Sequence, residues 1–199
     1  IKVFSEATIE KIEVGEHFIV SLSNGNKVFT DKVMGATGRV PNTKMLGLNN
    51  VGIKIGKKGN IIVNKFNQTN IESIYAIGDV TDRINLTPIA IAEGHAFSDR
   101  EFGNVNRFVS YDNVPSAVFS QPPLSVVGLT LEDTKILDIK ATEFVSEFNP
   151  LKNTISGKQE KTLMKLVVDD NDKVLGAHML GDYSPEIIQG IAVSIKAGA

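Results

Sequence analysis

The feature that most restricts the fold of this chain is a series of short β-type segments, each closed by a turn, in its C-terminal part. The series begins after residues 113–115 (NVP), and residues 169–172 (DDND) predict the turn that joins its last two members. Strands that follow one another through tight turns pair in antiparallel fashion. This part of the chain therefore predicts an antiparallel sheet in an α+β interaction domain. The expected strands are residues 117–120, 126–129, 141–148, 162–168 and 173–180.

Two helices are expected beside this sheet. Thr130 is a typical helix cap followed by acidic residues, and Ser184 precedes Pro185, which suits the first position of a helix. In the second helix an apolar stripe recurs at helical spacing and has to be buried. We expect Ile188 and Ile195 to face the domain's own sheet and the rest of the stripe to contribute to a symmetric dimer interface. The stripe consists of Ile187, Ile188, Ile191 and Ile195.

The N-terminal part carries shorter patterns. Residues 17–30 alternate apolar and polar side chains around Asn24-Gly25, which predicts a hairpin with a tight turn. Residues 32–42 read as an apolar strand that ends in GRVPN, where we expect a crossing between domains. Residues 51–64 predict a small sheet with tight turns. Residues 74–77 predict a short strand that is apolar on both faces and therefore covered on both, as in a parallel α/β sheet.

Asp79 follows this last strand, at the edge where open parallel sheets bind ligands. Its carboxylate can accept hydrogen bonds from the ribose or ribityl hydroxyls of a nucleotide cofactor. Thr87 and Pro88 predict a helix start, with the Thr87 hydroxyl as cap, and the helix should run to about residue 102. The free N–H groups of that start attract an electron-rich oxygen, such as one on a flavin ring. A turn aspartate and a plain helix cap explain the same pattern without a ligand.

Composition narrows the classes of function. The formal net charge is −2 and the basic residues are scattered, so we expect no nucleic-acid partner and no anionic membrane partner. No apolar run approaches the roughly 18 residues that span a bilayer, and the first residues lack the order of a signal peptide, so we expect a cytoplasmic protein. The chain contains no cysteine, so any thiol chemistry has to come from outside it. Its three histidines are not at metal-ligand spacing, and we expect no metal site.

Five motifs occur along the chain in the order and spacing of a known family. They are residues 36–43 (ATGRVPNT), 74–80 (IYAIGDV), 86–90 (LTPIA), 114–123 (VPSAVFSQPP) and 127–130 (VGLT). In this combination, which covers essentially the whole chain, the sequence resembles the FAD-dependent pyridine nucleotide-disulphide oxidoreductases. The LTP sequence and the paired prolines Pro122 and Pro123 resemble the glutathione reductase branch, whereas dihydrolipoamide dehydrogenases tend to differ at both places.

The resemblance implies three parts of the chain and two cofactors. Residues 1–40 would be the C-terminal end of an NADPH-binding domain, residues 41–110 the returning part of an FAD-binding domain, and residues 111–199 a truncated interface domain that forms a homodimer. The expected fold is thus two partial α/β nucleotide-binding portions followed by an α+β dimerisation domain. The substrate implied is glutathione disulfide.

The same resemblance implies roles for seven residues. Gly38 would lie against the nicotinamide nucleotide, Gly78 and Asp79 would contact the ribityl chain of FAD, and the helix start would face the flavin ring. The residues of that helix start are Leu86, Thr87 and Pro88. His95 stands where many glutathione reductases carry an arginine that can hold a carboxylate of glutathione, and an exposed helix histidine without a ligand is an equal alternative.

No catalytic residue is expected within this chain. By the resemblance, the glycine-rich cofactor fingerprints and the redox-active cysteine pair precede it, and the acid/base histidine follows it. The chain starts without methionine in a strand-like stretch and ends without a charged tail, so we expect a piece of a longer protein. Two alternatives stay open. One is a sister reductase that acts on lipoamide, trypanothione or mercuric ion, and the other is an inactive folding and dimerisation module.

Overall fold

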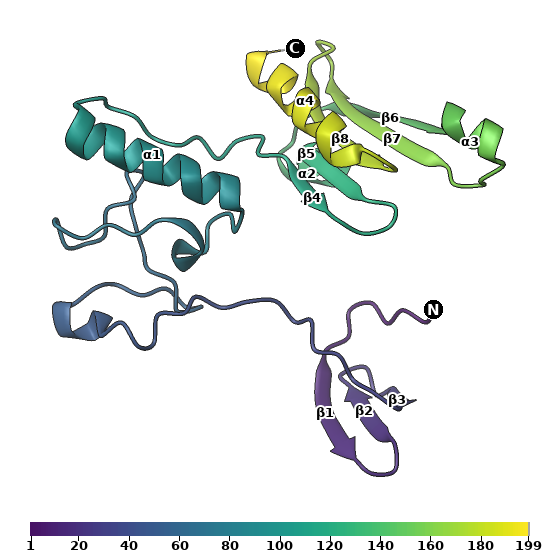
Figure 1. Cartoon of the computed structure of the whole chain (residues 1–199), viewed down its shortest axis with the longest axis horizontal. Helices are drawn as coiled ribbons and strands as arrows, with labels where there is room; N and C mark the ends of the chain where they lie inside the picture. The colour runs from purple at the N-terminus through teal and green to yellow at the C-terminus, as the bar shows by residue number, and fades with distance from the viewer. Residues whose placement is uncertain (199) are drawn as a thin grey trace. The chain divides into compact units, whose positions relative to one another are not determined.

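The computed structural model describes residues 1–198, and its internal contacts gather in two compact units. The first unit comprises residues 1–85, and the second begins at Leu86. Figure 1 labels the helices and strands of both units.

The first unit opens with a three-stranded antiparallel sheet in the order β1-β2-β3. Its strands are β1 (Ile9–Val14), β2 (Phe18–Leu22) and β3 (Lys27–Thr30). The predicted hairpin is confirmed, and its turn places Gly25 at a φ of 81°, a conformation that glycine adopts without strain. Val20 pairs with Val28 across the hairpin and is buried together with Leu22. Strand β1 was not predicted, because its side chains are mostly exposed and charged residues interrupt its apolar pattern.

Residues 31–85 contain turns and loops in place of the strands expected there. The apolar strand predicted at 32–42 and the buried strand predicted at 74–77 are wrong, since Tyr75 makes only an isolated bridge to Gln68 and Ile77 is exposed. The predicted sheet at 51–64 is reduced to a single bridge between Ile55 and Ile61. A strand needs a neighbour that accepts and donates its ladder hydrogen bonds, and no described segment lies beside these stretches in that way.

Side chains supply the hydrogen bonds that a sheet would otherwise supply here. The amide of Asn70 accepts from the Lys54 N–H at 2.8 Å and donates to the Gly52 carbonyl at 2.9 Å. The Thr43 hydroxyl donates to the Gly59 carbonyl at 2.6 Å. A small apolar core gathers around these loops, and two short 3₁₀ turns, η1 (Leu48–Val51) and η2 (Gly78–Thr81), complete the region. The buried residues of that core are Ile53, Ile61 and Ala76.

The second unit begins with the long helix α1 (Thr87–Gly103), which ends at Asn104 in the left-handed conformation. Its buried residues recur at helical spacing and are Ile89, Glu93 and Ala96. The prediction that the Thr87 hydroxyl caps the helix is wrong. Leu86 takes the cap position with an extended backbone (φ −128°, ψ 132°), so Thr87 already lies inside the helix and no side chain caps its start.

The rest of this unit is a five-stranded antiparallel sheet in the order β4-β5-β8-β7-β6, which confirms the expected α+β domain. Its strands are β4 (Ser116–Val118), β5 (Leu124–Gly128), β6 (Ala141–Phe148), β7 (Thr162–Asp169) and β8 (Val174–Leu180). Each of them matches a predicted strand to within a few residues. Figure 1 shows helix α4 (Ser184–Ala197) lying across β5 and β8, the strands it contacts most.

The core of this sheet lies between its central strands and α4. Ile188 is 1% exposed and Ile195 is buried beside it, as predicted, whereas Ile187 is 38% exposed. The residues packed together there are Val127, Ala177, Met179, Ile188, Ala192 and Ile195. Two shorter helices, α2 (Leu131–Ile136) and α3 (Leu151–Ser156), lie at the periphery, and α3 was not predicted. The predicted cap of α2 is confirmed, because Thr130 and Asp133 form a reciprocal capping box.

Candidate functional site

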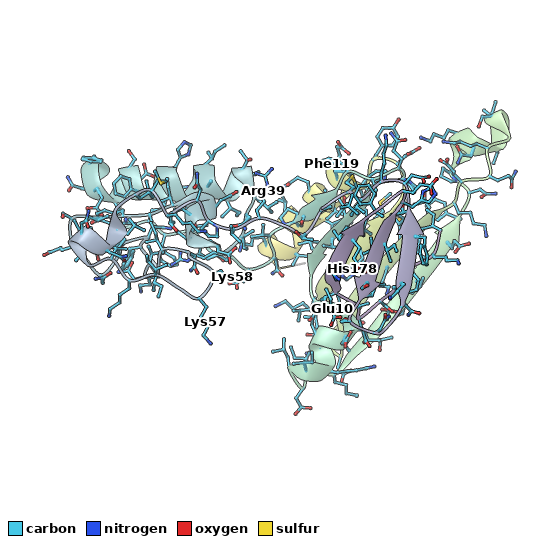
Figure 2. The ribbon with its side chains drawn as sticks, turned by 90° about the horizontal axis from the view of Figure 1, so that it is seen from below. Glu10, Arg39, Lys57, Lys58, Phe119 and His178 are labelled. Carbon is cyan, nitrogen blue, oxygen red and sulfur yellow. The ribbon has the colours of Figure 1, made fainter. Side chains whose placement is uncertain are left out.

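Asp79 lines a cavity of about 280 Å³ in the first unit. The cavity brings together parts of two of the sequence motifs, residues 39–42 of GRVPN and residues 79–80 of IGDV. Arg39, labelled in Figure 2, contributes from the segment that follows the three-stranded sheet. The lining residues are Arg39, Val40, Pro41, Asn42, Asp79, Val80 and Asn85. Asn85 was not among the residues singled out from the sequence, because no periodic pattern marks a single loop asparagine.

The turn that presents Asp79 is fixed by hydrogen bonds on both sides of it. Gly78 is buried at a φ of 69°, which a residue with a Cβ rarely adopts, and its carbonyl accepts from the Thr81 hydroxyl at 2.8 Å. The Ile61 N–H donates to the Val80 carbonyl at 2.9 Å, which ties the turn to the small core. The backbone conformation therefore favours glycine at 78, and the turn holds Asp79 at the cavity.

The carboxylate of Asp79 is an available hydrogen-bond acceptor. Its residue is exposed, and within residues 1–198 no protein group donates to its side chain. Asp82 in the same loop is used differently, since it forms a 3.1 Å ion pair with Lys58 and accepts from Asn85 at 3.1 Å. The hydrogen bond from Asn85, together with the nearby Lys58, lowers the pKa of Asp82 below its ordinary value. Of the two aspartates, only Asp79 is left to bind a group from outside the chain.

Gly38 does not line this cavity. It lies on an exposed stretch of backbone with a φ of 95°, and a Cβ added there would meet no atom within 4 Å. Open space at a positive φ permits the close approach of a ligand to the backbone. The geometry of Gly38 is thus compatible with a nucleotide contact, but the structure does not bring it to the wall that contains Asp79.

The start of helix α1 belongs to the second unit. The Leu86 carbonyl accepts from the N–H groups of Ile89 and Ala90 at 3.0 and 3.1 Å, so the first turn is regular. Thr87 and Pro88 are exposed, and Leu86 is half-buried. Pro88 has no N–H, so the N–H groups without an intrahelical partner at this start are those of Leu86 and Thr87, at the positive end of the helix dipole. A partly negative oxygen would be stabilised there.

His95 is an exposed residue in the middle of α1. This exposure is compatible with both interpretations made from the sequence. Two positions before it, Glu93 is 1% exposed and accepts a 2.5 Å hydrogen bond from the Tyr111 hydroxyl. This pair was missed from the sequence. The spacing of Glu93 from Ile89 and Ala96 places all three on one helix face, and that spacing could have identified the buried carboxylate.

Residues 1–198 hold no group of three or more histidine, cysteine, aspartate or glutamate side chains that could bind a metal ion. None of the helices described is long and apolar enough to cross a membrane.

Comparison with known proteins relates both units to one family. Residues 1–94 match the family model described as pyridine nucleotide-disulphide oxidoreductase, and residues 114–199 match the model of its dimerisation domain. The chain is 45% identical over 204 residues to a glutathione reductase of Nostoc sp., covering 96% of this chain and 44% of that protein. It is 44% identical over 182 residues to a trypanothione reductase of Trypanosoma congolense, covering 90% of this chain and 37% of that protein.

A solved structure gives the same result at the level of the fold. The HOCl-induced flavoprotein disulfide reductase RclA from Escherichia coli superposes with a TM-score of 0.84 at 27% identity, covering 96% of this chain and 44% of that one. The chain thus spans about two fifths of the length of the relatives it matches. Two models of a single family, matching residues 1–94 and 114–199, cover most of the chain in the expected order. The chain belongs to the pyridine nucleotide-disulphide oxidoreductase family.

Proposed function

We propose that this chain is part of a flavoprotein disulfide reductase that passes electrons from NADPH through FAD to glutathione disulfide. The observation that carries the proposal is the unpartnered carboxylate of Asp79, held by the Gly78 turn at a cavity that the GRVPN motif also lines. The similarity to glutathione reductase over nearly the whole chain supports the substrate. FAD supplies the redox chemistry when bound, by accepting electrons from the nicotinamide and delivering them to a disulfide.

The described residues fit the polar parts of such a cofactor. Asp79 would accept hydrogen bonds from ribityl hydroxyls, because a free carboxylate offers acceptors only. The start of α1, at Leu86, Thr87 and Pro88, would face the flavin pyrimidine and stabilise the negative charge of the reduced ring. Gly38 would allow the nicotinamide nucleotide to approach the backbone.

The proposal also assigns the parts of the chain and its assembly. Residues 1–40 would end the NADPH-binding domain, residues 41–110 would return to the FAD-binding domain, and residues 111–199 would form a homodimer. The exposed side of α4, which includes Ile187, supports the dimer because an apolar stripe on a helix favours burial. A cytoplasmic location fits this function, since glutathione keeps thiols reduced in that compartment.

The decisive experiment for the cofactor compares two aspartates in the full-length protein. Asp79→Ala should weaken FAD binding by roughly 10- to 100-fold, because a hydrogen bond to a charged group contributes about 1.5–3 kcal/mol. Asp170→Ala, which removes an exposed partner of Lys140, should leave FAD binding unchanged. Flavin absorbance measured after gel filtration and a fluorescence titration with FAD give both values. Full flavin occupancy in Asp79→Ala would contradict the proposed contact between Asp79 and FAD.

The helix start has its own test in the flavin reduction potential. Leu86→Asp should lower the potential and slow reduction by NADPH, because an acidic side chain opposes the charge of the reduced ring. The shift should be small, since a helix end contributes about 0.3–2 kcal/mol. Pro88→Gly should do less, because it loosens the helix start but keeps the neighbouring N–H groups. An unchanged potential in folded, flavin-loaded Leu86→Asp would show that α1 does not face the ring.

Trypanothione disulfide is the second candidate substrate, because a trypanothione reductase matches this chain nearly as well as a glutathione reductase does. Steady-state rates with NADPH and each disulfide separate the two, and a higher kcat/KM for trypanothione disulfide would replace the proposed substrate. If His95 holds a carboxylate of glutathione, His95→Ala should raise KM for glutathione disulfide and leave kcat nearly unchanged. An unchanged KM would make His95 an ordinary surface residue.

A further inference from the structure

A three-residue bridge joins helix α1 to helix α4 inside the second unit. Tyr111 lies in the irregular segment that follows α1, and its hydroxyl donates to the buried Glu93 carboxylate at 2.5 Å. On either side of it, Ser110 and Asp112 are held by Lys196 in the last turn of α4. The Lys196 ammonium donates to the Ser110 hydroxyl oxygen at 2.9 Å and to the Asp112 carbonyl at 2.8 Å.

The contact with α1 is the buried side of this bridge. Glu93 is 1% exposed and shares its helix face with Ile89 and Ala96. A carboxylate in such surroundings is costly unless donors compensate for its lost hydration. Tyr111 supplies such a donor from a segment with no regular backbone of its own, so the hydrogen bond fixes that segment against the helix.

The contact with α4 spans a long distance in sequence. Lys196 lies 84 to 86 residues after the groups it binds. It also occupies the last turn of α4, where a cation is favoured by the helix dipole. The bridge therefore connects the middle of α1 with the end of α4 through alternate residues of one short segment.

The start of α1 does not pack closely on α4. A cavity of about 280 Å³ lies there, lined by Leu86, Pro88 and Ile89 on one side and by residues of α4 on the other. Ser110, Asp112 and Lys196 line the same cavity. Where apolar side chains do not interdigitate, packing alone does not define the separation of two helices. The polar bridge, whose Ser110, Asp112 and Lys196 lie at the cavity wall, is a contact that can define it.

We infer that Tyr111 is a positioning residue that, together with Lys196, fixes the start of helix α1 relative to the dimerisation helix α4. Only the test that measures the flavin reduction potential rests on the proposed function, in which the start of α1 contacts the flavin. Through this bridge, the packing of α4 in the dimerisation domain is connected to the helix end proposed to stabilise the reduced flavin.

Hydrogen exchange tests the link without any cofactor. The Ile89 and Ala90 amides, which bond to Leu86, should exchange about tenfold faster in Tyr111→Phe, because a hydrogen bond to a charged group is lost. Lys196→Met should act in the same direction. The double variant should exchange no faster than the more affected single variant, since both remove the same bridge. Unchanged exchange in Tyr111→Phe, or additive effects, would overturn the inference.

Two matched variants control for the chemistry of the substitutions. Tyr183→Phe removes the hydroxyl of a tyrosine that is 65% exposed, and Lys140→Met removes an exposed ion pair with Asp170. Both should leave the exchange of Ile89 and Ala90 unchanged. If Tyr111→Phe fails to fold, Ser110→Ala tests the bridge from an exposed position and should accelerate exchange by a smaller factor, and no acceleration would overturn the inference.

The flavin potential separates a positioning role from a purely structural one. In flavin-loaded protein, Tyr111→Phe should lower the potential, and Tyr183→Phe should not. Faster exchange with an unchanged potential would overturn the positioning role of Tyr111. If the unsubstituted protein binds no flavin, the proposed function is wrong. The exchange experiment still tests whether Tyr111 and Lys196 fix the start of α1. If the unsubstituted protein is an active reductase and Tyr111→Phe changes neither the exchange rates nor the flavin potential, the inference about Tyr111 is wrong and the proposed function stands.

Discussion

The backbone N–H and C=O groups find their hydrogen-bond partners differently in the five-stranded domain and in residues 41–85. In the five-stranded domain, each strand bonds to its neighbours in an antiparallel ladder, and α4 covers an apolar core. In residues 41–85, side chains such as those of Asn70 and Arg83 bond to carbonyls of distant loops, and the buried core is three residues in size. A region built from loops held by side chains leaves polar groups such as Asp79 exposed at its surface.

The difference matches the functions that we propose for the two regions. A regular sheet presents a broad, stiff surface, which suits assembly with a second copy. Loops fixed at a few points can place one carboxylate at a cavity wall without burying it, which suits a cofactor. The substitutions that follow test whether the two regions depend on different forces.

The largest effect is expected in the core of the sheet. Ile188→Ala should lower the free energy of unfolding by about 2–5 kcal/mol, because a fully buried branched side chain leaves a cavity. Ile187→Ala, one position away and 38% exposed, should lower it far less. Urea unfolding followed by circular dichroism gives both values. Equal losses would mean that α4 does not present the described face to the sheet.

In the loop region, we expect the loss of a side chain that hydrogen-bonds to the backbone to lower stability. Asn70→Ala removes two hydrogen bonds to backbone groups and should cost about 1–2 kcal/mol. Asn149→Ala, at an exposed position after β6, should change stability by less than about 0.5 kcal/mol. Proteolysis between residues 50 and 75 should accelerate in Asn70→Ala only. Equal protease resistance in both variants would show that side-chain hydrogen bonds do not hold these loops.

A capping box shows that the sheet domain also depends locally on side chains. Thr130→Ala should lower the free energy of unfolding by about 1 kcal/mol, because the Asp133 N–H at the start of α2 loses its acceptor. Thr130→Ser keeps the hydroxyl and should restore most of the loss. Thermal unfolding of the three proteins measures the difference, and a serine variant as unstable as the alanine variant would contradict the cap.

The smallest effect is a pH dependence from His178, which is labelled on β8 in Figure 2. Burial, aided by the charge of Lys165, lowers the pKa of His178 below its ordinary value of 6.5, although Glu143 and Asp133 oppose the shift. The unfolded chain then binds the proton more readily than the folded one, so stability falls as the pH drops below 6.5. His178→Gln should flatten this slope between pH 7.5 and about 5.5 in urea unfolding. An identical slope in both proteins would exclude the contribution.

Sequence reasoning succeeded where local patterns and local structure coincide. The strands of the five-stranded sheet, the capping box of α2 and the buried positions Ile188 and Ile195 all followed from periodicity and cap residues. It failed at residues 74–77, which have the composition of a buried strand but only one bridge. Apolar composition shows that a segment is to be covered, whereas hydrogen bonding to a neighbour decides whether it is a strand.

The sequence by itself determined the family, through five motifs in order, and named Gly78 and Asp79 as candidates. Only the tertiary structure decided that Asp79 shares a cavity with Arg39 and Asn42, and that Glu93 is buried against Tyr111. Motifs and periodicities are properties of neighbouring residues, so they can be read along the chain. Contacts between residues that are 18 or more positions apart depend on how loops close, and no local propensity encodes that closure.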